Sequence, residues 1–257
     1  MKPRRLLAIA SALAMVAFLA PAAQANHSWG GYHWARTANP FTVKLGNNVS
    51  AAWSASLELA SSDWSQSAVL DTTVVPGGTR AKPCKATAGQ DQICSASYGN
   101  TGWLGVASIW LSGRHITQGT VKLNDYYFGA GSTYNTPAWR NMVTCQEIGH
   151  TFGLDHQDEN FSNTNLGTCM DYTSNPAGPP DNEHPNKHDY DELATIYGHL
   201  DSTTTVASAT TGSSAQVGND ASSWGRQVAG SRKAGFSTYV RDLGRGNQVV
   251  TFVTWAR

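Results

Sequence analysis

The feature that most constrains this chain is an eleven-residue run near its middle, from Gln146 to His156, with the sequence QEIGHTFGLDH. Gln146 and His150 are four residues apart, so on a helix both side chains point to the same face and can bind one ion. Gly153 permits a turn with positive φ, which can bring His156 back toward that ion. The spacing therefore predicts a helix that ends at Gly153 beside a metal site.

Two further features complete the constellation. Glu147 adjoins the ligand face, where a carboxylate can take a proton from metal-bound water and later pass it to a leaving amine. Met170 comes 14 residues after His156 and is followed by Asp171 and Tyr172. Either feature alone is a weak signal, but the pairing of this helix motif with a following methionine turn is specific.

Together these residues resemble the signature of the metzincin zinc proteases, HExxHxxGxxH followed by a Met-turn, with glutamine at the first position. The resemblance covers about residues 26–200. Its length and closing helix, DELATIYG, are nearest to the matrixins, whereas the Met-x-Tyr order at 170–172 is similar to astacins and serralysins. It implies an α+β catalytic domain with a mixed twisted sheet and helices, an active-site helix, an irregular lower subdomain with the Met-turn, and a C-terminal helix.

The resemblance also implies the site and the reaction. Zn²⁺ would be the cofactor, held by Gln146, His150 and His156. Glu147 would be the general base, and Tyr172 would help to stabilise the tetrahedral intermediate. We therefore expect a secreted zinc metalloendopeptidase, a hydrolase that cleaves protein or peptide substrates with metal-activated water. Structural Ca²⁺ is compatible with the resemblance but does not follow from the sequence.

Gln146 opens an alternative function. An amide oxygen is a weaker zinc ligand than imidazole, although zinc with a weaker donor remains a strong Lewis acid. The alternative is a catalytically weakened or inactive metzincin scaffold, a pseudoprotease that acts as a binding protein. His184 and His188, in the Pro-rich segment after the Met-turn, are the alternative sources of the missing imidazole.

The first 25 residues predict a secretory signal peptide. Three basic residues precede an apolar run from Leu6 to Ala20, and Ala23-Gln24-Ala25 fits a cleavage site. The run is shorter than the roughly 20 residues that a membrane-spanning helix needs. We expect residues 1–25 to be removed and the mature chain to be extracellular, with no membrane anchor.

The charge of the chain argues against nucleic acid as a partner. The sequence has 18 Lys and Arg against 18 Asp and Glu, and the signal peptide contains three of the basic residues. The mature net charge of about −3 offers no bulk attraction to a polyanion. We expect a monomer that acts on protein or peptide and binds no nucleic acid.

Four cysteines in an oxidising compartment predict two disulfides, with three pairings open. The resemblance favours one of them. Cys145 directly precedes the helix motif and Cys169 directly precedes Met170, so both would flank one metal site and bond to each other. Cys84 then pairs with Cys94 across a short loop. A cysteine metal site is not expected, because no CxxC spacing occurs.

Apolar patterning predicts the elements around the motif. Strands are expected at 41–44, 68–75, 102–112 and 116–124, with a helix over 49–64 packed across them. A second helix is expected to start at Thr136-Pro137 and to stop at Gly153. After an irregular stretch at 160–185, a helix capped by Asp189 is expected to end at Gly198.

The last part of the chain is expected to be distinct from the catalytic domain at 26–200. Residues 201–223 read as a Ser/Thr-rich linker, and residues 224–257 as a small basic β-hairpin element with strands at 236–243 and 249–255. We expect this element to pack on the catalytic domain. About 120 residues precede the motif in the mature chain and all are needed for the sheet, so no propeptide is expected and nothing in the sequence indicates a device for latency.

Overall fold

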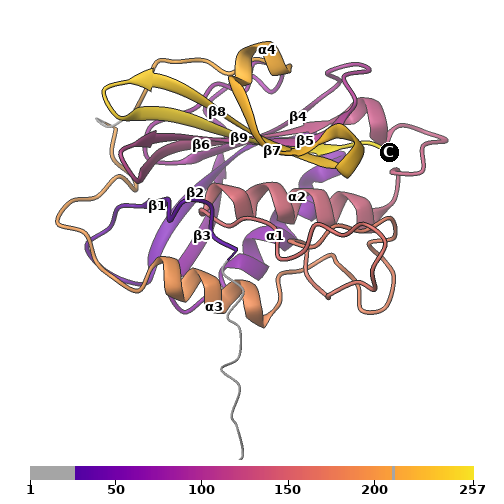
Figure 1. The fold of residues 1–257 in the computed structure, drawn as a ribbon, viewed down its shortest axis with the longest axis horizontal. Helices are drawn as coiled ribbons and strands as arrows, with labels where there is room; N and C mark the ends of the chain where they lie inside the picture. The colour runs from indigo at the N-terminus through magenta and orange to yellow at the C-terminus, as the bar shows by residue number, and fades with distance from the viewer. Residues whose placement is uncertain (1–26, 210–211) are drawn as a thin grey trace, which may run out of the picture.

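The strands of the protein form a mixed sheet whose one face is covered by the two longest helices (Figure 1). The computed structural model describes residues 27–209 and 212–257, so the predicted signal peptide, residues 1–25, lies outside the described residues. Nine described strands in one sheet and few helices confirm the expected α+β class.

The sheet is parallel on one side and antiparallel on the other. Its strand order is β3-β2-β4-β6-β5-β9-β8-β7, with β1 paired to β6 beside this path. Strands β3, β2, β4 and β6 are parallel, whereas each neighbouring pair from β6 through β5, β9 and β8 to β7 is antiparallel. The strands are β1 (His33–Trp34), β2 (Phe41–Asn48), β3 (Leu70–Pro76), β4 (Asp91–Ala96), β5 (Trp103–Ser112), β6 (His115–Asn124), β7 (Arg226–Ser231), β8 (Phe236–Gly244) and β9 (Asn247–Trp255).

The α-helices are α1 (Ala51–Trp64), α2 (Pro137–Thr151), α3 (Lys187–Ile196) and α4 (Ala221–Trp224), and two short 3₁₀ turns are η1 (Asp125–Phe128) and η2 (Arg232–Ala234). The predicted start of α2 is confirmed, because the Thr136 side chain accepts a hydrogen bond from the Trp139 amide at 3.2 Å. The predicted cap of α3 is wrong. Asn186 is the cap, and Asp189 is the third helical residue of a capping box with it.

The sequence did not predict β4. Its residues Asp91 and Gln92 are polar yet fully buried, so the strand lacks the apolar pattern that identified its neighbours. The polar groups are accommodated by hydrogen bonds. The Thr151 hydroxyl at the end of α2 donates to Asp91 at 2.7 Å, and the Gln92 amide donates to Thr87 at 3.0 Å. A buried strand of this kind is recognisable only when its partners are known.

Helices α1 and α2 pack on the sheet through large apolar side chains. Trp53, Leu57 and Trp64 of α1 are fully buried in the main core, as the spacing of four and three residues predicts. Trp64 also donates from its indole nitrogen to the Cys145 carbonyl at 3.2 Å, so α1 holds α2 directly. This contact positions the helix that carries the predicted metal motif.

Residues 212–219 of the predicted linker cross the sheet on β5 and β6. Lys122 donates to the carbonyl oxygens of Val217 and Gly218 and to the Asn219 side chain, at 2.9 to 3.1 Å. Trp103 and Trp110 of β5 and Gln118 of β6 donate to further carbonyls of this segment. A segment without an apolar pattern is thus held in place by its backbone carbonyls.

The side chains of the C-terminal strands lie in apolar clusters on both faces of the sheet. On the helix side, Val250 and Phe252 of β9 lie in the main core. On the other side, a second cluster contains Trp103, Val106, Trp224, Tyr239, Val253 and Trp255. Helix α4 lies on this second side (Figure 1). Strands β8 and β9 therefore extend the sheet and bury apolar side chains on both of its faces.

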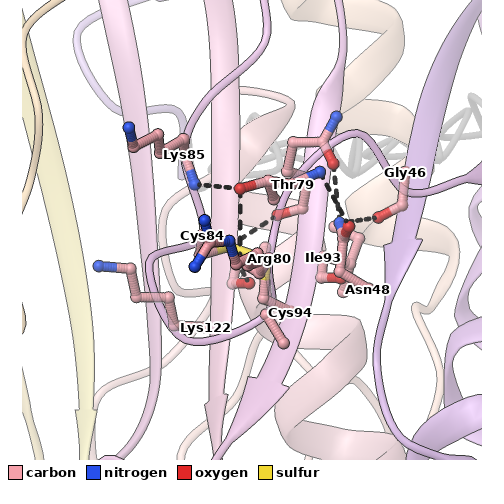
Figure 2. Close-up of a disulfide and its surroundings, with 12 residues drawn as sticks. Gly46, Asn48, Thr79, Arg80, Cys84, Lys85, Ile93, Cys94 and Lys122 are labelled. Atoms are coloured by element: carbon pink, nitrogen blue, oxygen red, sulfur yellow. Dashed lines mark hydrogen bonds between the residues drawn. A yellow bond between two sulfur atoms is a disulfide. The ribbon is translucent and has the colours of Figure 1, made fainter.

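Both predicted disulfide pairings are confirmed. Cys84 bonds to Cys94 and thereby joins the loop after β3 to β4, and Cys145 bonds to Cys169 (Figure 2 shows the first). The chain near Cys84 is further held by the Lys85 amide, which donates to the Thr79 hydroxyl at 3.0 Å. Among the described residues, no helix is long and apolar enough to span a membrane.

The burial of Phe252 yields a stability prediction. The side chain is 1% exposed, so Phe252→Ala should lower the free energy of unfolding by about 3–5 kcal/mol through lost burial and a cavity. The matched control is Tyr126→Ala, since Tyr126 is an aromatic residue that is 50% exposed. Urea unfolding followed by tryptophan fluorescence measures both variants, and equal effects would show that β9 does not pack in the core as described.

Candidate metal and catalytic site

Helix α2 and the turn after it bring the predicted site residues together. Gln146, Glu147 and His150 on α2 are all fully buried. The chain then turns at Gly153, whose φ is +93°, and a Cβ at this position would collide with the Tyr32 carbonyl oxygen. Only glycine fits there without strain. This turn returns His156 to the helix, as the sequence spacing predicts.

The two histidines face each other as metal ligands do. Their Nε2 atoms are 3.0 Å apart. His150 Nδ1 is 2.9 Å from the Leu154 carbonyl oxygen, to which it donates, so the lone pair of His150 is on Nε2. Burial lowers the pKa of His150 to about 3, which keeps the imidazole neutral. Two zinc ligands at the tetrahedral angle are about 3.3 Å apart, so this pair fits one ion.

The buried side chain of Gln146 already has two hydrogen-bond partners. Its side-chain nitrogen donates to the Cys169 carbonyl at 2.9 Å, and its oxygen accepts from the Thr254 hydroxyl at 2.8 Å. The first bond fixes which end of the amide is oxygen. Because a carbonyl oxygen has two lone pairs, one remains for a cation while Thr254 occupies the other. The Gln146 oxygen thus has one lone pair that no hydrogen bond uses.

Glu147 is fully buried against β5. A Cβ added at Gly105 would lie 2.6 Å from its carboxylate oxygen, so glycine makes room for this side chain. Burial raises the pKa of Glu147 to about 8, and the neighbouring Thr254 hydroxyl and Ala107 amide offset this only in part. At neutral pH the carboxyl is mainly protonated. It can act as a base only if water or a cation reaches it.

Tyr172 and Met170 form the other wall of the site. The ring of Tyr172 is 4.5 Å from that of His156, and burial raises the pKa of its hydroxyl well above the usual value. Met170 is fully buried and packs against α2, where its sulfur lies over Gly149. The Cys145–Cys169 disulfide joins this wall covalently to the helix.

The alternative histidines have other partners. His184 Nδ1 lies 2.7 Å from an oxygen of Asp63, and the ring of His188 stacks on that of His27 at 4.8 Å. Neither contact is with His150 or His156.

The C-terminal strands cover the site, which the sequence did not predict. The ring of Phe252 in β9 stacks on His150 at 4.3 Å with an interplanar angle of 5°. Phe236 in β8 lies 5.3 Å from the rings of both His156 and Tyr172. With Thr254 on Gln146, three residues of this hairpin touch the motif. Their apolar strand pattern predicted strands but carried no signal of where these would pair.

No protein-family model and no curated protein matches this chain. The matching solved structures include two of myroilysin, at 12% and 13% identity and a TM-score of 0.36, which align 64% and 69% of this chain with 96% of theirs. A third is high choriolytic enzyme 1, a hatching enzyme zinc-protease from the medaka fish Oryzias latipes, at 12% identity and a TM-score of 0.34, covering 65% of this chain and 94% of that one. The site itself must carry the functional argument.

The hydrogen bond between Thr254 and Gln146 yields a second prediction. Thr254→Val keeps the shape of the side chain but leaves the buried Gln146 oxygen without its donor, so the free energy of unfolding should fall by about 1–3 kcal/mol in metal-free protein. Thr203→Val at an exposed position should change it by less than about 0.5 kcal/mol. Urea unfolding in the presence of a chelator compares them. Equal changes in the free energy of unfolding for the two variants would show that the Thr254 hydroxyl does not stabilise Gln146.

Proposed function

We propose that this chain is a secreted, extracellular zinc endopeptidase that hydrolyses protein or peptide substrates as a monomer, and that its C-terminal hairpin keeps it latent. The observation that carries the proposal is the pair of histidine Nε2 atoms 3.0 Å apart, with Glu147 three residues before His150 on the same helix. Imidazole nitrogens with free lone pairs are the ligands that zinc prefers.

Each residue has a role that its position permits. His150 and His156, with the Gln146 oxygen, would hold Zn²⁺, which supplies an activated water when bound. Glu147 would accept a proton and pass it to the leaving amine. The buried Tyr172 hydroxyl would donate a hydrogen bond to the oxyanion that develops on the substrate. These roles need an ionised Glu147, and therefore a site that is more hydrated than the closed one.

The proposed latency rests on the pairing of β9 with β5 beside the site. Extended peptides often bind by adding a strand to an exposed sheet edge. The edge of β5 beside the site is paired with β9 from Trp103 to Ser112, and Phe252 covers His150. A peptide can reach Glu147 only if the hairpin leaves. The device for latency that the sequence did not reveal is, in this proposal, the hairpin itself.

The inactive scaffold remains a second candidate, and one observation favours it. Val250 and Phe252 lie in the main core together with residues of α1 and α2. Displacing β9 would expose both side chains to water, at a cost of about 1.5–3 kcal/mol each. If that cost is never met, the site stays closed and the protein acts through its outer surface.

Release of the hairpin separates the two candidates. A specific protease site inserted between Ser202 and Thr204, both exposed, would untether the hairpin and lower its effective concentration on the sheet. With zinc present, hydrolysis of a denatured protein should rise after cleavage. Glu147→Ala in the same cleaved protein should reduce turnover by roughly 10²- to 10⁴-fold without loss of zinc. If the cleaved protein binds zinc but shows no hydrolysis that depends on Glu147, the protease proposal is wrong and the inactive scaffold is the remaining candidate.

Gln146→His tests the third ligand. Imidazole in place of an amide oxygen should tighten zinc binding, measured by competition with a chromophoric chelator. Turnover of the opened protein at saturating zinc should change little, because Glu147 is untouched. Gln216→His, at an exposed position, is the control and should leave zinc affinity unchanged. An unchanged zinc affinity in Gln146→His would mean that residue 146 does not face the metal.

A further inference from the structure

Three histidines and one aspartate meet at a place that the motif does not include. His33 is in β1, His115 is the first residue of β6, and His199 and Asp201 follow α3. They line one surface pocket. The residues are far apart in the sequence, and the fold alone brings them together.

Their ligand atoms converge. One oxygen of Asp201, Oδ1, is 3.5 Å from His33 Nε2, 3.3 Å from His115 Nε2 and 3.7 Å from His199 Nε2. The Nε2 atoms of His33 and His199 are 3.2 Å apart. Four ligands at about 2.0–2.1 Å from a tetrahedral zinc are about 3.3 Å from one another. The separations of Asp201 from His33 and His115 are close to that value, and the ligand atoms of these three residues all lie within 4.8 Å of one another. His199 lies at the edge of this set and is not part of it.

Hydrogen bonds alone explain this arrangement poorly. A carboxylate oxygen has two lone pairs, so it cannot accept good hydrogen bonds from three imidazoles at once. Donation by all three would also require at least one proton on every Nε2, although the Nε2 atoms of His33 and His199 face each other. A cation between His33, His115 and Asp201 would give these three ligand atoms one partner.

The surroundings orient two of the ligands toward that position. His33 Nδ1 lies 2.9 Å from the Gly31 carbonyl oxygen and donates to it, which leaves the lone pair on Nε2. The other oxygen of Asp201, Oδ2, accepts from the Arg36 guanidinium at 2.9 Å and from the Arg36 amide at 3.2 Å. Only Oδ1 therefore remains for the three imidazoles. Such supporting contacts are typical of ligand residues at zinc sites.

We propose that His33, His115 and Asp201 form a second zinc site, separate from the motif site. Two imidazoles and one carboxylate suit zinc better than the oxygen-binding ions Mg²⁺ and Ca²⁺. Three protein ligands leave one position of a tetrahedral zinc for water. It would join β1, the turn between β5 and β6, and the segment that leads from α3 into residues 201–209.

Charged neighbours shape the affinity of this site. Arg114 and Glu192 line the same pocket, and Arg36 neutralises part of the Asp201 charge. His115 and His199 have side chains that are 37% and 53% exposed, whereas His33 and Asp201 are nearly buried, at 6% and 10%. Zinc can therefore enter from the surface, and the two exposed histidines can be replaced with little damage to the core.

The test uses the mature full-length chain and zinc alone. After equilibration with Zn²⁺ and removal of the excess, His115→Ala should contain one zinc fewer per chain than wild type. Affinity at this site should fall by more than the roughly 10- to 100-fold that loss of a supporting residue costs. The control is His184→Ala, whose side chain is similarly exposed, at 47%, and it should retain the full zinc content.

Two further arms make the result specific. His156→Ala removes a ligand of the motif site and should leave the second site filled, so failure of the proposed protease would not affect this outcome. Co²⁺ in place of zinc should give the visible absorption of a tetrahedral site in the His156→Ala protein, and His115→Ala added to it should abolish that absorption. Metal-free variants that unfold in urea like metal-free wild type would exclude misfolding. Equal zinc content in His115→Ala and wild type would overturn the proposal.

Discussion

The antiparallel pairing of β5 with β9 is the interaction on which the rest of the site depends. It runs from Trp103 to Ser112 against Asn247 to Trp255 and places alternate side chains of β9 on opposite faces. One face brings Phe252 and Thr254 to the motif helix, and the other brings Val253 and Trp255 to the second apolar cluster. A shift of one residue in this pairing would exchange the two sets.

The burial produced by this pairing also sets the chemistry of the motif residues. Burial lowers the pKa of His150 and raises that of Glu147, so the imidazole is neutral and the carboxyl protonated. The neutral His150 is ready for a cation, whereas a protonated carboxyl is unfit as a base. The same burial therefore favours metal binding by His150 and prevents Glu147 from acting as a base. A bound cation would shift the balance, because positive charge lowers the pKa of a neighbouring carboxyl.

Much of this was predictable from the sequence, and the reasons for the rest are physical. The motif predicted α2, the Gly153 turn and the meeting of His150 with His156, because these depend on local spacing. Strand β4 was missed because its buried Asp91 and Gln92 depend on distant partners. The covering of the site by Phe236 and Phe252, and the cluster around Asp201, involve residues far apart in the chain. Such contacts leave no periodic signal in one sequence.

The position of β9 at the end of the chain has a consequence for folding. Its partner β5 is more than a hundred residues earlier, and pairings of such long range form slowly because a large loop must close first. A chain that emerges from its N-terminus can complete β1 to β6, α1, α2 and the turn at Gly153 before β9 exists. Until β9 pairs, its Phe252 and Thr254 do not cover His150 and Gln146, so the chain meets ions and water with this side of the motif uncovered.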